Sequence, residues 1–289
     1  MRLRIRHETT YRYSMPVKFG EWRLLLRPID SHSIRVLDAQ LSLTPPGRTR
    51  WTMDAYSNSV CHFTPSGSSN ILRIVSTLLI ERYPNSLRDA EWTAALSPVG
   101  ALAPPVIYSP ADATALAPFI RPVYAEHPAH SAWLNAHRGH AGDSSLDLLL
   151  RLNQAIHREF SYGVREEYGT LTPAETIQRG AGTCRDFAWL MIESLRRWGF
   201  AARFVTGYLY SSAGVRGSHS THAWCEAFLP DLGWIEFDPT NGLSESPDLI
   251  RVAATRTPEE ASPVSGVALG NGTSWLEASV SVELDNAQV

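Results

Sequence analysis

The sequence predicts an α+β protein: an N-terminal antiparallel β domain, then a core in which a cysteine-bearing helix packs on an antiparallel sheet. Up to residue 83, polar and apolar residues alternate with the period of strands. Residues 145–159 and 184–198 instead carry apolar side chains at helical spacing. After them, HAWCEAF and GWIEFDP form two strand-like runs around the turn sequence LPDLG.

Composition restricts the classes of protein that need to be considered. The chain has 289 residues, 44% of them apolar, and a formal net charge of −3. We therefore expect a globular protein with no electrostatic footprint for nucleic acid or an anionic membrane. The start, MRLRIRHETTYRYSM, lacks the apolar region of a signal peptide, and no apolar run approaches a membrane span, so a cytoplasmic location is expected. Three cysteines cannot all pair, which leaves at least one free thiol.

The N-terminal β domain is predicted to cover residues 1–83. Its strands are expected in four runs: LRIRHETTYRY, EWRLLLRP, SIRVLDAQLSLTPP and ILRIVSTLLIERY. From 84 to 142 prolines and alanines multiply, which predicts a connecting region with one short helix near 111–119. The core is expected over 143–245, and 246–289 are expected to supply C-terminal strands that pack back on the protein.

Two helices of the core are marked by capping residues. Ser144 with an acid three residues later predicts a capping box at the start of the 145–159 helix. Thr172, Pro173 and Glu175 predict the start of a second, short helix that Gly180 ends. AARFVTGYLY then reads as a strand broken by a glycine, and the SSAGVRGSHS loop, 211–220, is a candidate flap beside a cleft.

Cys184 is expected in the first turn of the next helix, near its N-cap, in the stretch GAGTCRDFAWLMIESLRRWGF. A thiol at a helix N-terminus lies near the positive end of the helix dipole and near unpaired N–H groups, which favour the nucleophilic thiolate and can stabilise an oxyanion. A free cysteine is also commonly a small buried hydrophobe. Chemistry at Cys184 therefore requires a base, and the base requires a group that fixes its tautomer.

His222 and Asp238 are the candidates for the base and its orienting group. A hairpin centred on Pro230, with a loop of three or five residues, would place His222 directly across from Asp238, on one face of the ribbon. A two-residue turn at Asp231-Leu232 would put them on opposite faces and exclude the pair. The register of this hairpin therefore decides whether a Cys-His-Asp site can form.

A metal site is the competing interpretation of the same residues. His219, His222 and Cys225 are spaced by three, and Cys184 could complete a tetrahedral set. On a strand, however, residues three apart point to opposite faces. We therefore expect no metal and no cofactor, and a packing role for Cys225.

The blocks GAGTCRDFAWLMIESLRRWGFAARFVTGY and HAWCEAFLPDLGWIEFDPTNG resemble the transglutaminase-like superfamily of papain-like thiol enzymes. RHETTYRYSMPVKFGEWRLLLRP is similar to the N-terminal β region of its bacterial members. The resemblance implies Cys184 as nucleophile, His222 as general base and acid, and Asp238 as its orienting group. The reaction would form a thioester on a peptide or amide and resolve it with water or an amine.

Supporting residues are less defined by the sequence. Tyr162 stands in for the tryptophan that serves the oxyanion in animal transglutaminases, Asp186 is expected to cap its helix, and Trp224 is grouped with them as an oxyanion or supporting residue. Arg185 departs from the family pattern, which often has glutamine there.

Three alternatives to a peptidase or amidase stay open. They are a protein-glutamine transamidase, an acyltransferase that resembles arylamine N-acetyltransferases, and a catalytically silent binding module. A peptide or protein amide is the expected substrate, and the sequence gives no oligomeric state.

Overall fold

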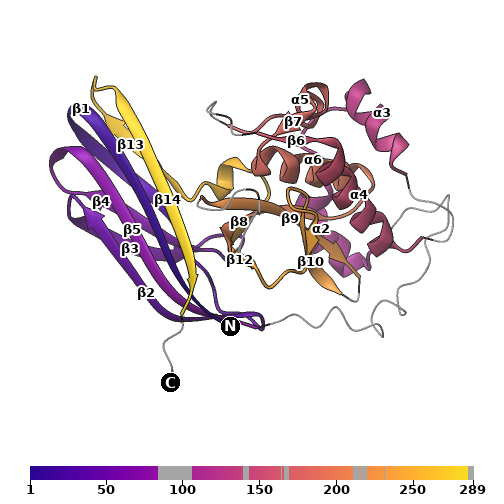
Figure 1. Ribbon diagram of the computed structural model, residues 1–289, viewed down its shortest axis with the longest axis horizontal. Helices are drawn as coiled ribbons and strands as arrows, with labels where there is room; N and C mark the ends of the chain where they lie inside the picture. The colour runs from indigo at the N-terminus through magenta and orange to yellow at the C-terminus, as the bar shows by residue number, and fades with distance from the viewer. Residues whose placement is uncertain are drawn as a thin grey trace.

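The computed structural model describes residues 1–83, 106–138, 143–163, 165, 169–210, 216, 220–230 and 232–285. Figure 1 shows two lobes side by side, a curved sheet on the left and a helix-covered sheet on the right. The predicted α+β architecture is confirmed. No helix in these described ranges is long and apolar enough to cross a bilayer.

The left lobe is one seven-stranded antiparallel sheet with the order β2-β5-β1-β4-β3, to which β13 and β14 add by pairing with β1. The first two predicted strands are a single long strand, β1, whose first half pairs with β5 and β14 and whose second half pairs with β4 and β13. The first five strands are β1 (Arg2–Arg27), β2 (Ile34–Thr44), β3 (Gly47–Met53), β4 (Ser59–Pro65) and β5 (Ser68–Arg82).

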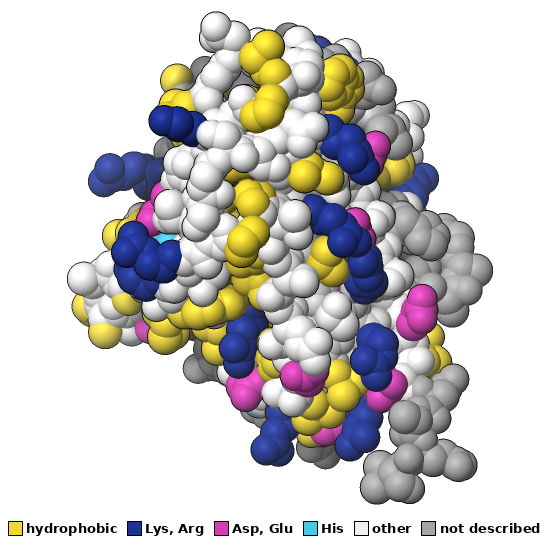
Figure 2. Space-filling model, turned by 90° about the vertical axis from the view of Figure 1, so that its left-hand side faces the viewer, with side chains coloured by type: hydrophobic (Ala, Val, Ile, Leu, Met, Phe, Trp, Pro, Cys, Tyr) yellow, Lys and Arg dark blue, Asp and Glu magenta, His cyan; other side chains and the backbone are white. Residues whose placement is uncertain are grey.

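Strands β3 and β4 were not expected from the sequence. Their burial shows why: β3 is exposed along most of its length, and β4 has adjacent buried residues at Val60 and Cys61 rather than a clean alternation. The outward face of this lobe mixes basic, acidic and apolar side chains (Figure 2).

Two helices lie in the predicted connecting region. The expected short helix is α2 (Pro110–Ile120), and α3 (Pro128–Ala136) is an additional helix with a weak apolar face. Residues 84–105 and 139–142 of this region lie outside the described residues.

The right lobe carries the remaining helices on a five-stranded antiparallel sheet with the order β11-β10-β9-β8-β12. Its helices start and stop at the predicted caps: Ser144 and Thr172 each form a capping box, and Gly180 takes a left-handed conformation at φ 62°. The elements are α4 (Ser145–Glu159), β6 (Ser161–Tyr162), α5 (Pro173–Arg179), β7 (Ala181–Gly182), α6 (Cys184–Arg197), β8 (Ala202–Leu209), β9 (His222–Leu229), β10 (Gly233–Asp238), β11 (Leu243–Ser244) and β12 (Leu249–Thr255).

Gly207 does not break its strand, contrary to the sequence interpretation. Strand β8 runs through it, and a Cβ there would lie 2.1 Å from the Ile250 carbonyl oxygen and 2.7 Å from the Trp224 ring. The glycine therefore permits the close approach of β12 and of an indole beside the site.

The C-terminal segment joins the two lobes. After β12 completes the core sheet, the turn η2 (Glu259–Ala261) leads back to the left lobe, where β13 (Val264–Leu269) and β14 (Ser274–Leu284) pair with β1. A buried apolar cluster holds the lobes together, with Leu3, Ile5, Leu78 and Ile80 from one sheet against Tyr208, Ile250 and Val252 from the other.

Candidate active site

Cys184 is the first residue of α6, and this helix packs on β8 and β9 through the main core cluster. The thiol is 8% exposed. The other two cysteines, Cys61 and Cys225, are buried at 0% exposure, and burial raises the pKa of Cys61 to about 11 and raises that of Cys225 further. Cys184 lines a cavity of about 550 Å³, and neither Cys61 nor Cys225 is among the residues that line it.

The first turn of α6 is braced by Asp186. Its carboxylate accepts hydrogen bonds from the Thr183 N–H and hydroxyl (2.8 and 2.9 Å), from the Leu171 N–H (2.8 Å) and from the Arg165 guanidinium (3.0 Å). A Cβ at Gly182 would lie 2.9 Å from the Asp186 Cβ, so glycine is required for this packing. The hydrogen bonds of Asp186 to Thr183, Leu171 and Arg165 therefore hold the helical turn that carries Cys184 in place.

The hairpin of β9 and β10 has a different register from the predicted one. Leu229 pairs with Gly233 and Cys225 with Phe237, so the loop centres on residue 231 and, in that register, Asp238 lies across from Trp224. Gly233, at φ 77°, supplies the left-handed residue that closes a three-residue loop, which explains the shift from Pro230. The predicted direct opposition of His222 and Asp238 is therefore wrong by two residues.

A shift of two residues preserves the face of the ribbon, so the pair still forms on a diagonal. His222 Nε2 lies 2.8 Å from Asp238 Oδ2, and both side chains are buried. Asp238 also accepts from the Thr240 N–H (3.0 Å) and from the Asn241 amide (2.8 Å). Sequence reasoning missed Asn241, although its position in DPTNG, three residues after Asp238, was available as a signal.

The charge state of this pair follows from competing effects. Burial lowers the pKa of His222, but the Asp238 charge and hydrogen bond, followed by smaller contributions from Cys184, raise it to about 10. Burial raises the pKa of Asp238, yet His222, Asn241 and Thr240 lower it overall. An imidazolium and a carboxylate are therefore the favoured forms near neutral pH.

The other ring nitrogen, His222 Nδ1, is buried and has no hydrogen-bond partner among the described residues. His222 and Cys184 line the same cavity, of about 550 Å³, and the thiol contributes to the pKa of the imidazole. Because Nε2 is held by Asp238, Nδ1 is the atom left to exchange a proton with Cys184.

Tyr162 also lines this cavity, because β6 pairs with β7 and sets Tyr162 beside Gly182, two residues before the nucleophile. Burial, with added contributions from Cys184 and Asp238, raises the pKa of Tyr162 to about 12. Its hydroxyl therefore remains a hydrogen-bond donor at neutral pH. Part of the lining that the sequence analysis did not anticipate comes from the segment after β12, namely Pro258, Glu259, Ala261, Ser262 and Pro263.

Trp224 does not line the cavity. Its ring stacks on His222, with centroids 6.0 Å apart and planes 28° apart, and its Nε1 donates to Glu236 (3.2 Å). Of the two roles expected for Trp224, oxyanion donor or support, its position fits support of the imidazole.

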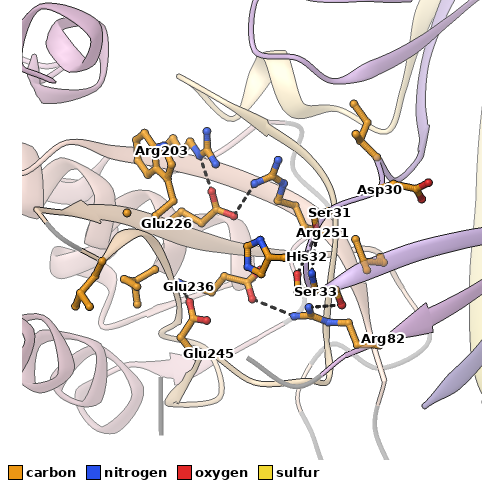
Figure 3. Close-up of a pocket in the computed structure, with 16 residues that line it drawn as sticks. Asp30, Ser31, His32, Ser33, Arg82, Arg203, Glu226, Glu236, Glu245 and Arg251 are labelled. Atoms are coloured by element: carbon orange, nitrogen blue, oxygen red, sulfur yellow. Dashed lines mark hydrogen bonds and ion pairs between the residues drawn. The ribbon is translucent and has the colours of Figure 1, made fainter. Parts of the chain in front are cut away.

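A second polar pocket of about 470 Å³ lies behind Trp224, between the two lobes. Figure 3 shows Glu226 held between Arg203 and Arg251, and Arg82 of β5 reaching Glu236. Burial, together with the charge of Glu226, raises the pKa of Glu236 to about 8, against the opposing charge of Arg82. This network connects the N-terminal sheet to the indole that supports His222.

The alternative metal set does not assemble in the described part of the chain, where no group of three His, Cys, Asp or Glu side chains could hold an ion. His219 and most of the 211–220 loop, the candidate flap, lie outside the described residues. Cys225 packs in the core cluster, on the α6 side of the sheet.

Comparison with known proteins gives the family. Residues 135–239 match the model of the transglutaminase-like superfamily, and residues 3–81 match that of the bacterial transglutaminase-like N-terminal region. The chain belongs to the transglutaminase-like superfamily. The first match contains Cys184, His222 and Asp238, and the second covers most of the N-terminal sheet.

Relatives and a solved structure are similar to this chain over different shares of its length. An uncharacterized protein of Mycobacterium tuberculosis is 28% identical over 97% of this chain and 92% of its own. A protein-glutamine gamma-glutamyltransferase of Pseudomonas aeruginosa is 32% identical, over 32% of this chain and 15% of its own. The crystal structure of a Cytophaga hutchinsonii protein, described as a candidate cysteine protease, has the same fold, with a TM-score of 0.72 and 19% identity over 100% of this chain and 92% of its own.

Proposed function

We propose that this protein is a thiol amidase or peptidase that uses Cys184 as nucleophile, His222 as general acid and base, and Asp238 as the group that orients His222. The supporting observation is that the two ring nitrogens of His222 differ: Nε2 is hydrogen-bonded to a buried carboxylate, and Nδ1 has no partner among the described residues and belongs to a residue that lines the same cavity as the thiol.

Acylation begins when the Cys184 sulfur attacks the carbonyl carbon of the amide. The backbone N–H groups of the first turn of α6 have no intrahelical acceptor, so they and the Tyr162 hydroxyl are the proposed donors to the oxyanion. His222 then gives its Nδ1 proton to the leaving nitrogen, the carbon–nitrogen bond breaks, and a thioester on Cys184 remains.

Deacylation reverses the role of His222. The imidazole, neutral after giving up its proton, takes a proton from water as the water oxygen attacks the thioester. The carbon–sulfur bond then breaks, the carboxylic acid leaves, and the thiolate and imidazolium are restored.

An amine in place of water would make the protein a transamidase, which is the second candidate function. Water wins this competition unless a site concentrates the amine. Glu259 is the one acidic side chain among the described residues of the cavity lining, and it is exposed to water, where an ion pair with an alkylammonium group is weak. We therefore favour hydrolysis, and competition between water and a primary amine for the acyl-enzyme, followed by mass spectrometry of the products, separates the two.

The test of the nucleophile is Cys184→Ala. We expect loss of turnover and of iodoacetamide labelling. The melting temperature should not change, because Cys184 lines a cavity and the smaller alanine side chain only enlarges that cavity. The buried Cys61 and Cys225 are internal references that should stay unlabelled in the folded protein. Labelling that goes mainly to either of them, or turnover that survives the substitution, contradicts the assignment. Unimpaired binding of peptides without any acyl-enzyme in the wild type would instead support a silent binding module.

A further inference from the structure

Arg185 lies in the wall of the cavity that holds Cys184 and is a cation with no partner among the residues that the structure describes. Its side chain is half-buried, lines the cavity and has no hydrogen bond or ion pair with any residue that the structure describes. A half-buried guanidinium is normally paired, because its donors lose water when they are covered. The missing partner is therefore expected to come from the substrate.

The other charges of the cavity are already neutralised or lie elsewhere. Arg165 is paired with Asp186, and His222 with Asp238. Glu259, the acidic side chain of the described lining, is exposed and forms no ion pair with Arg185. Among the described residues, the wall beside the nucleophile thus keeps a positive charge that no acidic side chain pairs.

The positive charge of Arg185 acts on the neighbouring Tyr162. Burial raises its pKa, whereas Arg185 and Arg216 both act to lower it. Arg185 therefore acts on the same space, next to Cys184, in which the Tyr162 hydroxyl lies.

The position of Arg185 in α6 suits it to bind a group beside the reacting carbonyl. Consecutive residues of a helix point about 100° apart, so Arg185 flanks Cys184 instead of lying behind it. The Asp186 bonds fix the turn that carries both residues, so little order has to be gained on binding.

We propose that Arg185 binds a carboxylate of the substrate adjacent to the amide that Cys184 attacks, and so makes the cavity selective for acidic peptides. This inference rests on the proposed amide chemistry at Cys184. The carboxylate is either an Asp or Glu side chain or a free C-terminus, and in both cases the planar guanidinium can accept it in a two-pronged pair.

The first experiment uses iodoacetate and iodoacetamide, which differ by one carboxylate. Each forms a sulfur–carbon bond at Cys184 and releases iodide. We expect Arg185→Gln to lower the ratio of the iodoacetate rate to the iodoacetamide rate about fivefold, as for loss of a partly exposed ion pair. Arg185→Lys should lower this ratio less than Arg185→Gln does, because lysine keeps the positive charge but lacks the planar guanidinium. The His222 imidazolium also attracts anions, but it is present in the wild type and in both variants. Differences between their ratios therefore report on Arg185.

Arg158→Gln is the matched control, because Arg158 is an exposed arginine of α4 outside the cavity. Its ratio should equal that of the wild type. An unchanged ratio in Arg185→Gln, with a wild-type melting temperature, overturns the inference. Alkylation requires only the thiol of Cys184. A role of Arg185 in binding carboxylates can therefore be demonstrated even if the protein cleaves no amide. Conversely, the protein can cleave amides even if Arg185 has no such role.

A second set of probes distinguishes the two sources of the carboxylate. Chloroacetyl-glycine carries a terminal carboxylate, chloroacetyl-aspartic acid α-amide carries a side-chain carboxylate, and chloroacetyl-glycinamide is neutral. Each would alkylate Cys184 with loss of chloride. Faster reaction of either acid than of the neutral probe, abolished in Arg185→Gln, supports the proposal and names the source. Equal rates for all three overturn it.

Discussion

Replacing Asp238 by asparagine tests how far one carboxylate controls the site. The Oδ2 atom of Asp238 accepts from both His222 and Asn241, and Oδ1 accepts from the Thr240 N–H. Asparagine offers one acceptor oxygen and one NH₂ group, so either orientation leaves at least one buried donor facing another donor. The substitution therefore removes the charge and also breaks the hydrogen-bond pattern.

The magnitude follows from the pKa of His222. A rise from 6.5 to about 10 corresponds to about 5 kcal/mol of preference for the imidazolium, at about 1.4 kcal/mol per pH unit. Asp238 provides the two largest contributions to the rise, and burial acts against it. We expect Asp238→Asn to lower the pKa of His222 by about two units or more, and to slow acylation about 10²–10⁴-fold, the range for general acid and base catalysis.

The sign of the linkage gives a second consequence. Because the folded-state pKa of His222 is raised, its stabilisation of the wild type is complete below pH 6.5 and is lost as the pH rises towards 10. Asp238→Asn should remove this loss.

The assay is an NMR titration of labelled His222 in the wild type and in Asp238→Asn, with urea unfolding at pH 6 and pH 10. Asp38→Asn is the control, since Asp38 is an exposed acid of β2. A wild-type His222 that titrates between pH 6 and 7, or a titration that Asp238→Asn leaves unchanged, would refute the reasoning.

Two further predictions concern the supports of the site. Gly182→Ala should lower the unfolding free energy by about 1–3 kcal/mol and slow alkylation of Cys184, because the new Cβ would meet Asp186. Gly163→Ala is the control, since a Cβ there would have nothing within 4 Å, and it should change neither quantity. Equal losses in the two variants would contradict the prediction. In Glu236→Gln, urea unfolding should show the variant gaining stability relative to the wild type between pH 5 and pH 9. The reason is that the raised pKa of about 8 makes ionisation of the buried Glu236 beside Glu226 destabilising over that interval. A constant difference across that interval would argue against the raised pKa.

Local chemistry made much of the core predictable. Helix α4 and helix α5 begin and end at their capping residues, because a cap satisfies N–H groups that are set by the local sequence alone. The place of Cys184 at a helix start followed from the same kind of signal. In the N-terminal lobe, by contrast, β3 was missed because an exposed strand needs no apolar alternation, and β4 because its buried residues begin as an adjacent pair.

The hairpin shows the limit of such reasoning. The alternation of side chains along each strand correctly placed His222 and Asp238 on one face. The hairpin, however, is centred one residue beyond the predicted Pro230, because Gly233 supplies the left-handed residue that closes the loop. The contact that forms is a diagonal one, and a sheet's twist and the length of the imidazole allow it.

By itself the sequence determined the family, the capped helices, the thiol at a helix N-terminus and the shared face of its two partners. Only the tertiary structure decided what surrounds them: Asn241 on Asp238, Trp224 on His222, and Arg185 in the cavity wall with no partner among the described residues. Caps and strand parity depend on neighbours in the chain, whereas these contacts depend on how separate strands, loops and lobes pack, which local periodicity does not encode.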